Sequence, residues 1–199
     1  MFICAPSVAN NSFVLSVVKE IGAKVLDSDT RLIADGKHIR LVARGKWEFV
    51  ERKKVSGIVG IVAVTDENKM ILIEQYRAPV NRRVIEIPAG LAGDIVGSED
   101  EALEIAAQRE LLEETGFEAK TMTRLVDGVS SAGITSEVIT LFRATGLTRT
   151  GKGGGDGSED IEVHEIPVDQ VHQWVQDREK SGAIVDFKVY AGLFFVKSA

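Results

Sequence analysis

One acidic stretch, residues 98–116, constrains what this chain can fold into more than any other part of the sequence. Ser98 precedes a run of acidic residues and Gly116 follows the last of the periodic positions, and these are the start and stop signals of a helix. At 100° per residue, Glu110 and Glu114 fall within about 20° of Leu103 on the helical wheel. The stretch therefore predicts a helix over 98–116 whose protein-facing side carries carboxylates.

The carboxylates on this face need a compensating charge. Glu110 and Glu114 share the face with Ala106 and Ala107, and Glu113 lies at its edge. Like charges four residues apart repel, and burial adds a desolvation cost unless a cation is bound. A solvated acidic face is the alternative interpretation, but the small alanines favour the close approach of another backbone. Oxygen ligands suit Mg²⁺ or Mn²⁺ rather than zinc, so we predict a divalent metal site.

The end of this stretch resembles the signature of the Nudix hydrolase family. Residues 109–117 read Arg-Glu-Leu-Leu-Glu-Glu-Thr-Gly-Phe, and the signature's further Glu, eight positions before the Arg, is present as Glu101. The signature Gly, six positions before that Glu, is replaced by Ile95, and the nearest glycines are Gly90 and Gly93. With Gly90 as the counterpart, the loop is five residues longer than the family standard.

Composition narrows the classes of function. The net charge of −6, without any Lys/Arg block, argues against a nucleic-acid surface. The single cysteine, Cys4, excludes an internal disulfide and fits a reducing compartment. We find no signal peptide and no apolar stretch of membrane-spanning length, and we expect a cytoplasmic protein with no membrane partner.

Strands are predicted on both sides of the acidic helix. Short apolar segments separated by Gly or Asp-Gly turns occupy 13–18, 24–27, 37–42 and 47–52. The continuous apolar run at 56–64 predicts a central buried strand, and further strands are predicted at 70–77, 83–88, 123–129, 136–145 and 161–166. Two more helices are expected, at 168–180 and 186–196.

This order of elements predicts an α/β fold with a mixed sheet covered on both faces. It is similar to the α/β/α sandwich of Nudix hydrolases over residues 55–199, preceded by a small N-terminal β-strand subdomain at 1–54. These extra strands resemble the ADP-ribose and nucleoside diphosphate sugar pyrophosphatase branch, whose members are usually dimers with exchanged N-terminal strands. Few strands are marginal alone, so we expect them to pack on the main domain or on a second subunit in a homodimer.

The resemblance also extends the metal site beyond the helix. In similar enzymes the carbonyl at the position of Ala89 is a metal ligand, while Pro88-Ala89-Gly90 also reads as a tight turn, and both interpretations stand. Ala89, Glu110 and Glu114 are thus expected to hold Mg²⁺, with Mn²⁺ as an alternative. Arg109 is expected to orient the neighbouring carboxylates by pairing.

A glycine-rich acidic loop is predicted at 147–160, and it is expected to be mobile. Its Glu-Asp-Ile run resembles ADP-ribose pyrophosphatases, in which the Glu aligned with Glu159 reaches the metals. The Glu assigned there as the base that activates water, two residues earlier, is Gly157 here. The base is therefore left open among Glu159, Glu113, Asp156 and Glu162. A solvated disordered loop is the alternative.

Three side chains are candidates for binding the substrate's phosphates and base. Residues 74–77 resemble the Glu-Gln-x-Arg of the same branch, in which the Arg holds phosphate, and this role suits the guanidinium of Arg77. A surface salt bridge is the alternative. Trp47 and Arg52 are predicted to sandwich a nucleobase, although core packing accounts for Trp47 equally well.

A second loop and two histidines are the remaining residues considered for the site. Residues 131–137 resemble the family's Ser-Pro-Gly loop, with Ala132 in place of the Pro, and end in Glu137, which is expected to touch metal, water or sugar. His164 and His172 lack ligand-like spacing and are expected to be structural.

Together these features predict a Mg²⁺-dependent hydrolase of nucleoside diphosphate sugars such as ADP-ribose and GDP-mannose. Water attacks one phosphorus and releases a nucleoside monophosphate and a sugar phosphate. Two alternatives stay open: hydrolysis of nucleoside triphosphates or damaged nucleotides, and a non-catalytic nucleotide-sugar sensor. The N-terminal strands and the Glu-Asp-Ile run argue against the first, and the complete set of helix carboxylates argues against the second.

Overall fold

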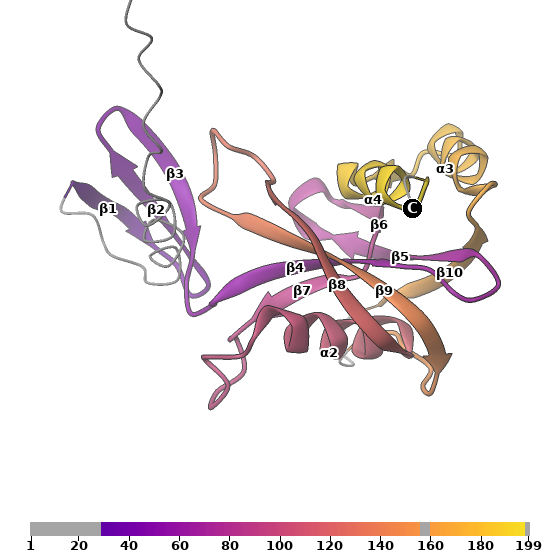
Figure 1. Ribbon diagram of the computed structural model, residues 1–199. Helices are drawn as coiled ribbons and strands as arrows, with labels where there is room; N and C mark the ends of the chain where they lie inside the picture. Colours follow the sequence, from indigo (N-terminus) through magenta and orange to yellow (C-terminus); the bar gives the residue numbers. More distant parts are fainter. Residues whose placement is uncertain (1–28, 156–159, 198–199) are drawn as a thin grey trace, which may run out of the picture.

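Two four-stranded sheets and three helices form the main body of the computed structural model, which describes residues 29–155 and 160–197 (Figure 1). One sheet has the order β7–β4–β9–β8 and consists of β4 (Gly57–Ala63), β7 (Ala89–Ala92), β8 (Phe117–Val129) and β9 (Val138–Arg149). The other has the order β10–β5–β6–β11 and consists of β5 (Lys69–Arg77), β6 (Arg82–Glu86), β10 (Glu162–Pro167) and β11 (Ile184–Val185). The helices are α2 (Leu103–Thr115), α3 (Val171–Lys180) and α4 (Phe187–Lys197), and a short 3-10 helix, η1 (Ala78–Val80), follows β5. Within the described ranges, no helix is long and apolar enough to cross a membrane.

Strand β4 lies at the centre because its residues are apolar on both faces. It pairs antiparallel with β7 and parallel with β9. Ile61 packs with Leu111 of α2 on one side, and Val62 packs with Val189 and Leu193 of α4 on the other. Figure 1 shows α2 on one side of the strands and α3 and α4 on the opposite side. The predicted α/β/α sandwich and the buried central strand are confirmed, although the strands divide into two sheets instead of one.

The acidic helix begins later than its sequence predicts. Its first residue is Leu103, and Ser98 does not cap it. The chain from Ser98 to Glu101 forms a separate turn, in which the amide of Glu101 donates to the carbonyl of Ser98 at 3.0 Å. The predicted end is correct: Gly116 adopts φ 75°, the left-handed conformation typical of a helix C-terminus.

Further features differ from the sequence analysis. Of the tight turn read at residues 88–90, Ala89 and Gly90 belong to β7 because their backbone pairs with β4. Strand β9 runs on to Arg149, so the glycine-rich loop starts later than 147. Strand β1 (Thr30–Asp35), which the sequence did not reveal, opens the N-terminal sheet. The strands predicted at 13–18 and 24–27 lie outside the described residues.

The N-terminal sheet is joined to the main body at one end of its last strand. It consists of β1, β2 (Ile39–Arg44) and β3 (Trp47–Arg52), paired antiparallel in that order. The amide of Val50 donates to Ile134 at 2.8 Å, and the amide of Ser136 donates to Val50 at 3.1 Å. This junction places the end of β3 beside the loop at 131–137. A domain boundary at residue 54 stays a prediction.

Candidate active site

A cleft of about 620 Å³ lies where α2, β7 and the end of β3 meet. Its walls come from segments that are distant in the sequence, including β5, the loop before β9 and the start of α4. Eight of the ten site residues predicted from the sequence line it: Arg52, Arg77, Ala89, Arg109, Glu110, Glu113, Glu114 and Glu137. The fold thus brings most of the predicted residues into one place.

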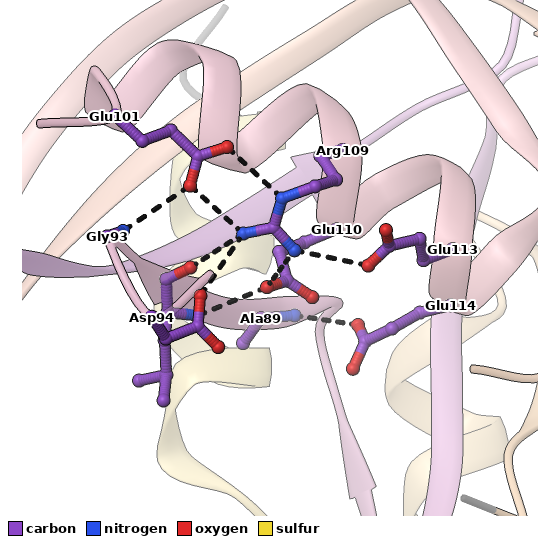
Figure 2. Close-up of polar contacts among 9 residues, drawn as sticks. Ala89, Gly93, Asp94, Glu101, Arg109, Glu110, Glu113 and Glu114 are labelled. Atoms are coloured by element: carbon purple, nitrogen blue, oxygen red, sulfur yellow. Dashed lines mark hydrogen bonds and ion pairs between the residues drawn. The ribbon is translucent and has the colours of Figure 1, made fainter. Parts of the chain in front are cut away.

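Two carboxylates of α2 reach the backbone of β7 (Figure 2). The amide of Ala89 donates to Glu114 Oε2 at 2.9 Å, and the amide of Leu91 donates to Glu110 Oε1 at 3.2 Å. Glu114 is 3% exposed, so the helical wheel placed it on the correct face. Gly90 is needed between these contacts because a Cβ there would lie 1.9 Å from the carboxyl carbon of Glu110. This contact favours Gly90 as the counterpart of the signature glycine.

Arg109 is the centre of the ion-pair network in Figure 2. Its guanidinium donates to both oxygens of Glu101 at 3.1 Å, to Glu110 at 2.9 Å and to Glu113 at 3.1 Å. It also donates to the carbonyl of Leu91 at 2.8 Å. Arg109 therefore ties the start of α2, its carboxylate face and β7 together, in the orienting position that the sequence suggested.

The charges of this network are unevenly matched, because one guanidinium pairs with four carboxylates, those of Asp94, Glu101, Glu110 and Glu113. Burial raises the pKa of Glu110 from 4.5 to about 7, although Arg109 opposes the shift. Arg109 lowers the pKa of Glu101, and its contact with Glu101 raises its own pKa. Glu110 is the point at which the site lacks positive charge. The carboxylate oxygens of Glu110 and Glu114 are ligands that suit a hard divalent cation.

The cleft is also lined by two arginines that are fixed by carboxylates. Arg77 pairs with the buried Glu86 at 2.7 Å, so it takes part in a salt bridge and also faces the cleft. Arg52 at the end of β3 pairs with Glu137 at 2.9 Å. This second pair links the N-terminal sheet to the main body at the rim of the cleft.

Trp47 does not lie with Arg52, so within one chain the predicted sandwich is wrong. The two residues are at opposite ends of β3, which separates them by about 17 Å at the usual rise of a strand. A cation–π contact needs about 6 Å. Core packing does not account for Trp47 either, since its side chain is 59% exposed.

The candidates for the catalytic base are only partly described. Glu113 lines the cleft with a side chain that is 42% exposed. Glu162 lies on β10 opposite Glu74, outside the cleft residues. Asp156 and Glu159 lie outside the described residues, so the metal and catalytic roles assigned to Glu159 stay predictions.

A second acidic cluster lies on the other sheet and consists of Glu74, Glu162 and His164. Burial alone would raise the pKa of Glu74, but Arg178 and Arg83 outweigh it and lower that pKa. Because two guanidinium groups already neutralise Glu74, this cluster is a poor cation site. His164 packs against Trp174 with ring centroids 4.9 Å apart, in agreement with a structural role.

Sequence reasoning missed three polar residues that line the cleft: Asp94, Ser130 and Lys188. Asp94 Oδ1 lies 3.6 Å from Arg109, and Lys188 pairs with Asp186 at 2.5 Å. Lys188 stands in a segment that reads only as an apolar helix, and no local signal connects it to a site. Asp94 belongs to the extended loop, where its charge was the available signal.

Comparison with known proteins agrees with this geometry. The family profile named NUDIX domain matches residues 56–187. A methanol dehydrogenase activator of Bacillus methanolicus is 35% identical, over 75% of this chain and 82% of its own. An ADP-ribose pyrophosphatase of Bacillus subtilis is 37% identical, over 68% of this chain and 71% of its own. A GDP-mannose pyrophosphatase of Enterobacter sp. is 31% identical, over 74% of this chain and 75% of its own.

A solved structure shares the fold. It is described as an ADP compounds hydrolase and superposes with a TM-score of 0.66 at 20% identity, over 88% of this chain and 96% of its own. The matched profile spans more than half of the chain, including α2, β7 and the cleft carboxylates. The chain belongs to the Nudix hydrolase family.

Proposed function

We propose that this protein hydrolyses the pyrophosphate bond of nucleoside diphosphate sugars in a Mg²⁺-dependent reaction. The observation that carries the proposal is the cleft itself, which is lined both by carboxylates of α2 and by two arginines and is large enough for a nucleotide. Two of the relatives described above are pyrophosphatases of ADP-ribose and GDP-mannose. The lone cysteine and the acidic net charge fit the proposed cytoplasmic location.

The residues present fit a divalent metal. Glu110 and Glu114, with the Ala89 carbonyl, are the proposed ligands for Mg²⁺ or Mn²⁺, and the raised pKa of Glu110 marks where positive charge is lacking. When bound, the ion offsets the negative charge of the diphosphate. Arg109 holds the carboxylates in register by pairing with Glu110 and Glu113.

The two arginines that line the cleft are suited to the substrate's anionic groups. Arg77 offers a guanidinium held by Glu86, and Arg52 offers one held by Glu137, so both are preorganised for phosphate oxygens. Glu113 is the described candidate for accepting the proton of the attacking water. The water oxygen bonds to one phosphorus as the bridging P–O bond breaks, giving a nucleoside monophosphate and a sugar phosphate.

We also propose that the protein is a homodimer formed through the N-terminal sheet. Leu32, Ile39 and Trp47 expose 54%, 46% and 59% of their surface on this sheet. By the strand register Leu32 and Trp47 lie on one face of the sheet and Ile39 on the other, and exposed apolar groups on short strands are typical of a surface that another chain covers. Because β3 also carries Arg52, the proposed interface adjoins the cleft.

The class of substrate is tested by phosphate-monoester release from ADP-ribose, GDP-mannose, UDP-glucose and dGTP, with Mg²⁺ or with EDTA. We expect turnover of one or more diphosphate sugars, no turnover in EDTA, and little activity on dGTP. Preference for dGTP would move the protein to the triphosphate branch. Tight binding of a compound without turnover of any of them would indicate a non-catalytic nucleotide-sugar sensor.

Substitution Glu114→Gln is expected to lower kcat by about a hundredfold or more, because it removes a buried negative oxygen from the proposed ligand set. Glu104→Gln is the matched control, since Glu104 is an exposed residue in the first turn of the same helix. Circular dichroism would check that both variants are folded. A normal rate in Glu114→Gln would remove Glu114 from the site.

The raised pKa of Glu110 predicts a specific pH dependence of stability. The folded protein holds this proton more tightly than the unfolded chain, so the contribution of Glu110 to stability is full below pH 4.5 and is lost as pH rises towards 7. In EDTA we therefore expect the Tm to fall between pH 5 and 7.5, and Mg²⁺ to raise the Tm more at pH 7.5 than at pH 5. Thermal melts of Glu110→Gln should lack this difference. If Mg²⁺ raised the Tm of wild type equally at pH 5 and pH 7.5, the raised pKa of Glu110 would be contradicted.

The dimer is tested by light scattering after size exclusion. We expect twice the monomer mass for wild type and a shift towards monomer for Leu32→Glu, because a charge would be buried in the interface. Val96→Glu is the control, since Val96 is 95% exposed in the extended loop, away from the N-terminal sheet. A monomeric wild type would refute the proposed dimer.

A further inference from the structure

The last turn of α2 is bonded to the glycine-rich segment that follows β9. The amide of Gly154 donates to the carbonyl of Glu114 at 2.9 Å, and the amide of Gly155 donates to the carbonyl of Glu113 at 3.0 Å. The last carbonyls of a helix have no partner within the helix, so each needs one from elsewhere. Here the partners come from a segment about 40 residues later, and they bond to two residues whose carboxylates line the cleft.

This contact is so close that it requires glycine at one position. A Cβ on Gly153 would lie 2.4 Å from the carbonyl carbon of Thr115 and 2.7 Å from the carbonyl oxygen of Glu114. Gly153, Gly154 and Gly155 also have φ values of 70°, 106° and 86°, which side chains of L-residues disfavour. The glycines at 153–155 therefore make a close and specific contact with the helix. The sequence analysis predicted only a mobile loop here.

Glu114 is consequently held at two points. Its carboxylate accepts from the amide of Ala89 in β7, and its carbonyl accepts from the amide of Gly154. A movement of the helix end would shift the carboxylate relative to β7. Groups that hold a metal ligand in position change the affinity of a site for its metal although they do not contact the metal.

We propose that residues 153–155, which we call the glycine brace, are a positioning element that sets the carboxylate of Glu114 for metal binding. The proposal rests on the proposed function, since it takes Glu114 as a metal ligand. It assigns to the brace an effect on metal affinity in addition to any effect on stability.

The test compares Gly153→Ala with Gly151→Ala. An added Cβ at Gly153 collides with the helix backbone, whereas a Cβ at Gly151 makes an ordinary contact of 3.6 Å with the Cα of Gly116. We expect Gly153→Ala to weaken Mn²⁺ binding, measured by the electron paramagnetic resonance of free Mn²⁺, by about tenfold. Its Mg²⁺ activation constant should rise in step, while kcat at saturating Mg²⁺ changes less. Gly151→Ala should bind Mn²⁺ like wild type.

A purely structural role for the brace predicts a different result. Gly153→Ala would then have a lower Tm but unchanged Mn²⁺ affinity at temperatures where it is folded, and this outcome would overturn the proposal. If Gly153→Ala does not fold, the Mn²⁺ affinity of Gly154→Ala tests the proposal instead. Its Cβ enters open space, with Ile161 O at 4.0 Å as the nearest atom, and only its φ is disfavoured. A smaller loss of Mn²⁺ affinity supports the brace, and wild-type affinity refutes it.

Failure of the proposed function would be recognised separately. If wild type turns over no diphosphate sugar, that function is refuted, whereas Mn²⁺ binding by the variants still reports on the brace. The two proposals therefore do not stand or fall on the same measurement.

Discussion

The contact between the carboxylate face of α2 and the backbone of β7 is the constraint on which the site depends. A buried carboxylate costs on the order of several kcal/mol unless it is paired and hydrogen-bonded. Glu114 is buried and Glu110 is partly buried because amides of Ala89 and Leu91 and the guanidinium of Arg109 meet their carboxylates. Without a Cβ at Gly90, the strand comes close enough for these bonds.

The same contact connects the site to the hydrophobic core. The small side chains of Ala106 and Ala107 are fully buried and bring α2 close to the strands. Leu111 packs in the same cluster as Val59 and Ile61 of β4, whose neighbour is β7. The carboxylates therefore stand on a rigid helix at the edge of the core, which is how a site keeps its geometry.

Helical periodicity was enough to predict which carboxylates face inward, because 3.6 residues per turn places Glu110 and Glu114 together. The helix start at Leu103 was not predictable from Ser98, since Glu101 is held by Arg109 and by the amide of Gly93 instead of by helical bonds. Tertiary pairing likewise decides that residues 89–92 are a strand. The separation of Trp47 from Arg52 follows from strand geometry, but only once both are known to lie on β3.

The pair Arg52–Glu137 gives the N-terminal sheet a direct connection to the cleft. Val50 bonds to the backbone of Ile134 and Ser136, so backbone hydrogen bonds join β3 to the loop at 131–137. Arg52 closes this junction with its guanidinium against Glu137, and both side chains line the cleft. Any displacement of the sheet must then move a wall of the cleft. A partner chain that covers the exposed apolar groups of the sheet would act on the cleft through this pair, and the sheet is thereby part of the site's architecture.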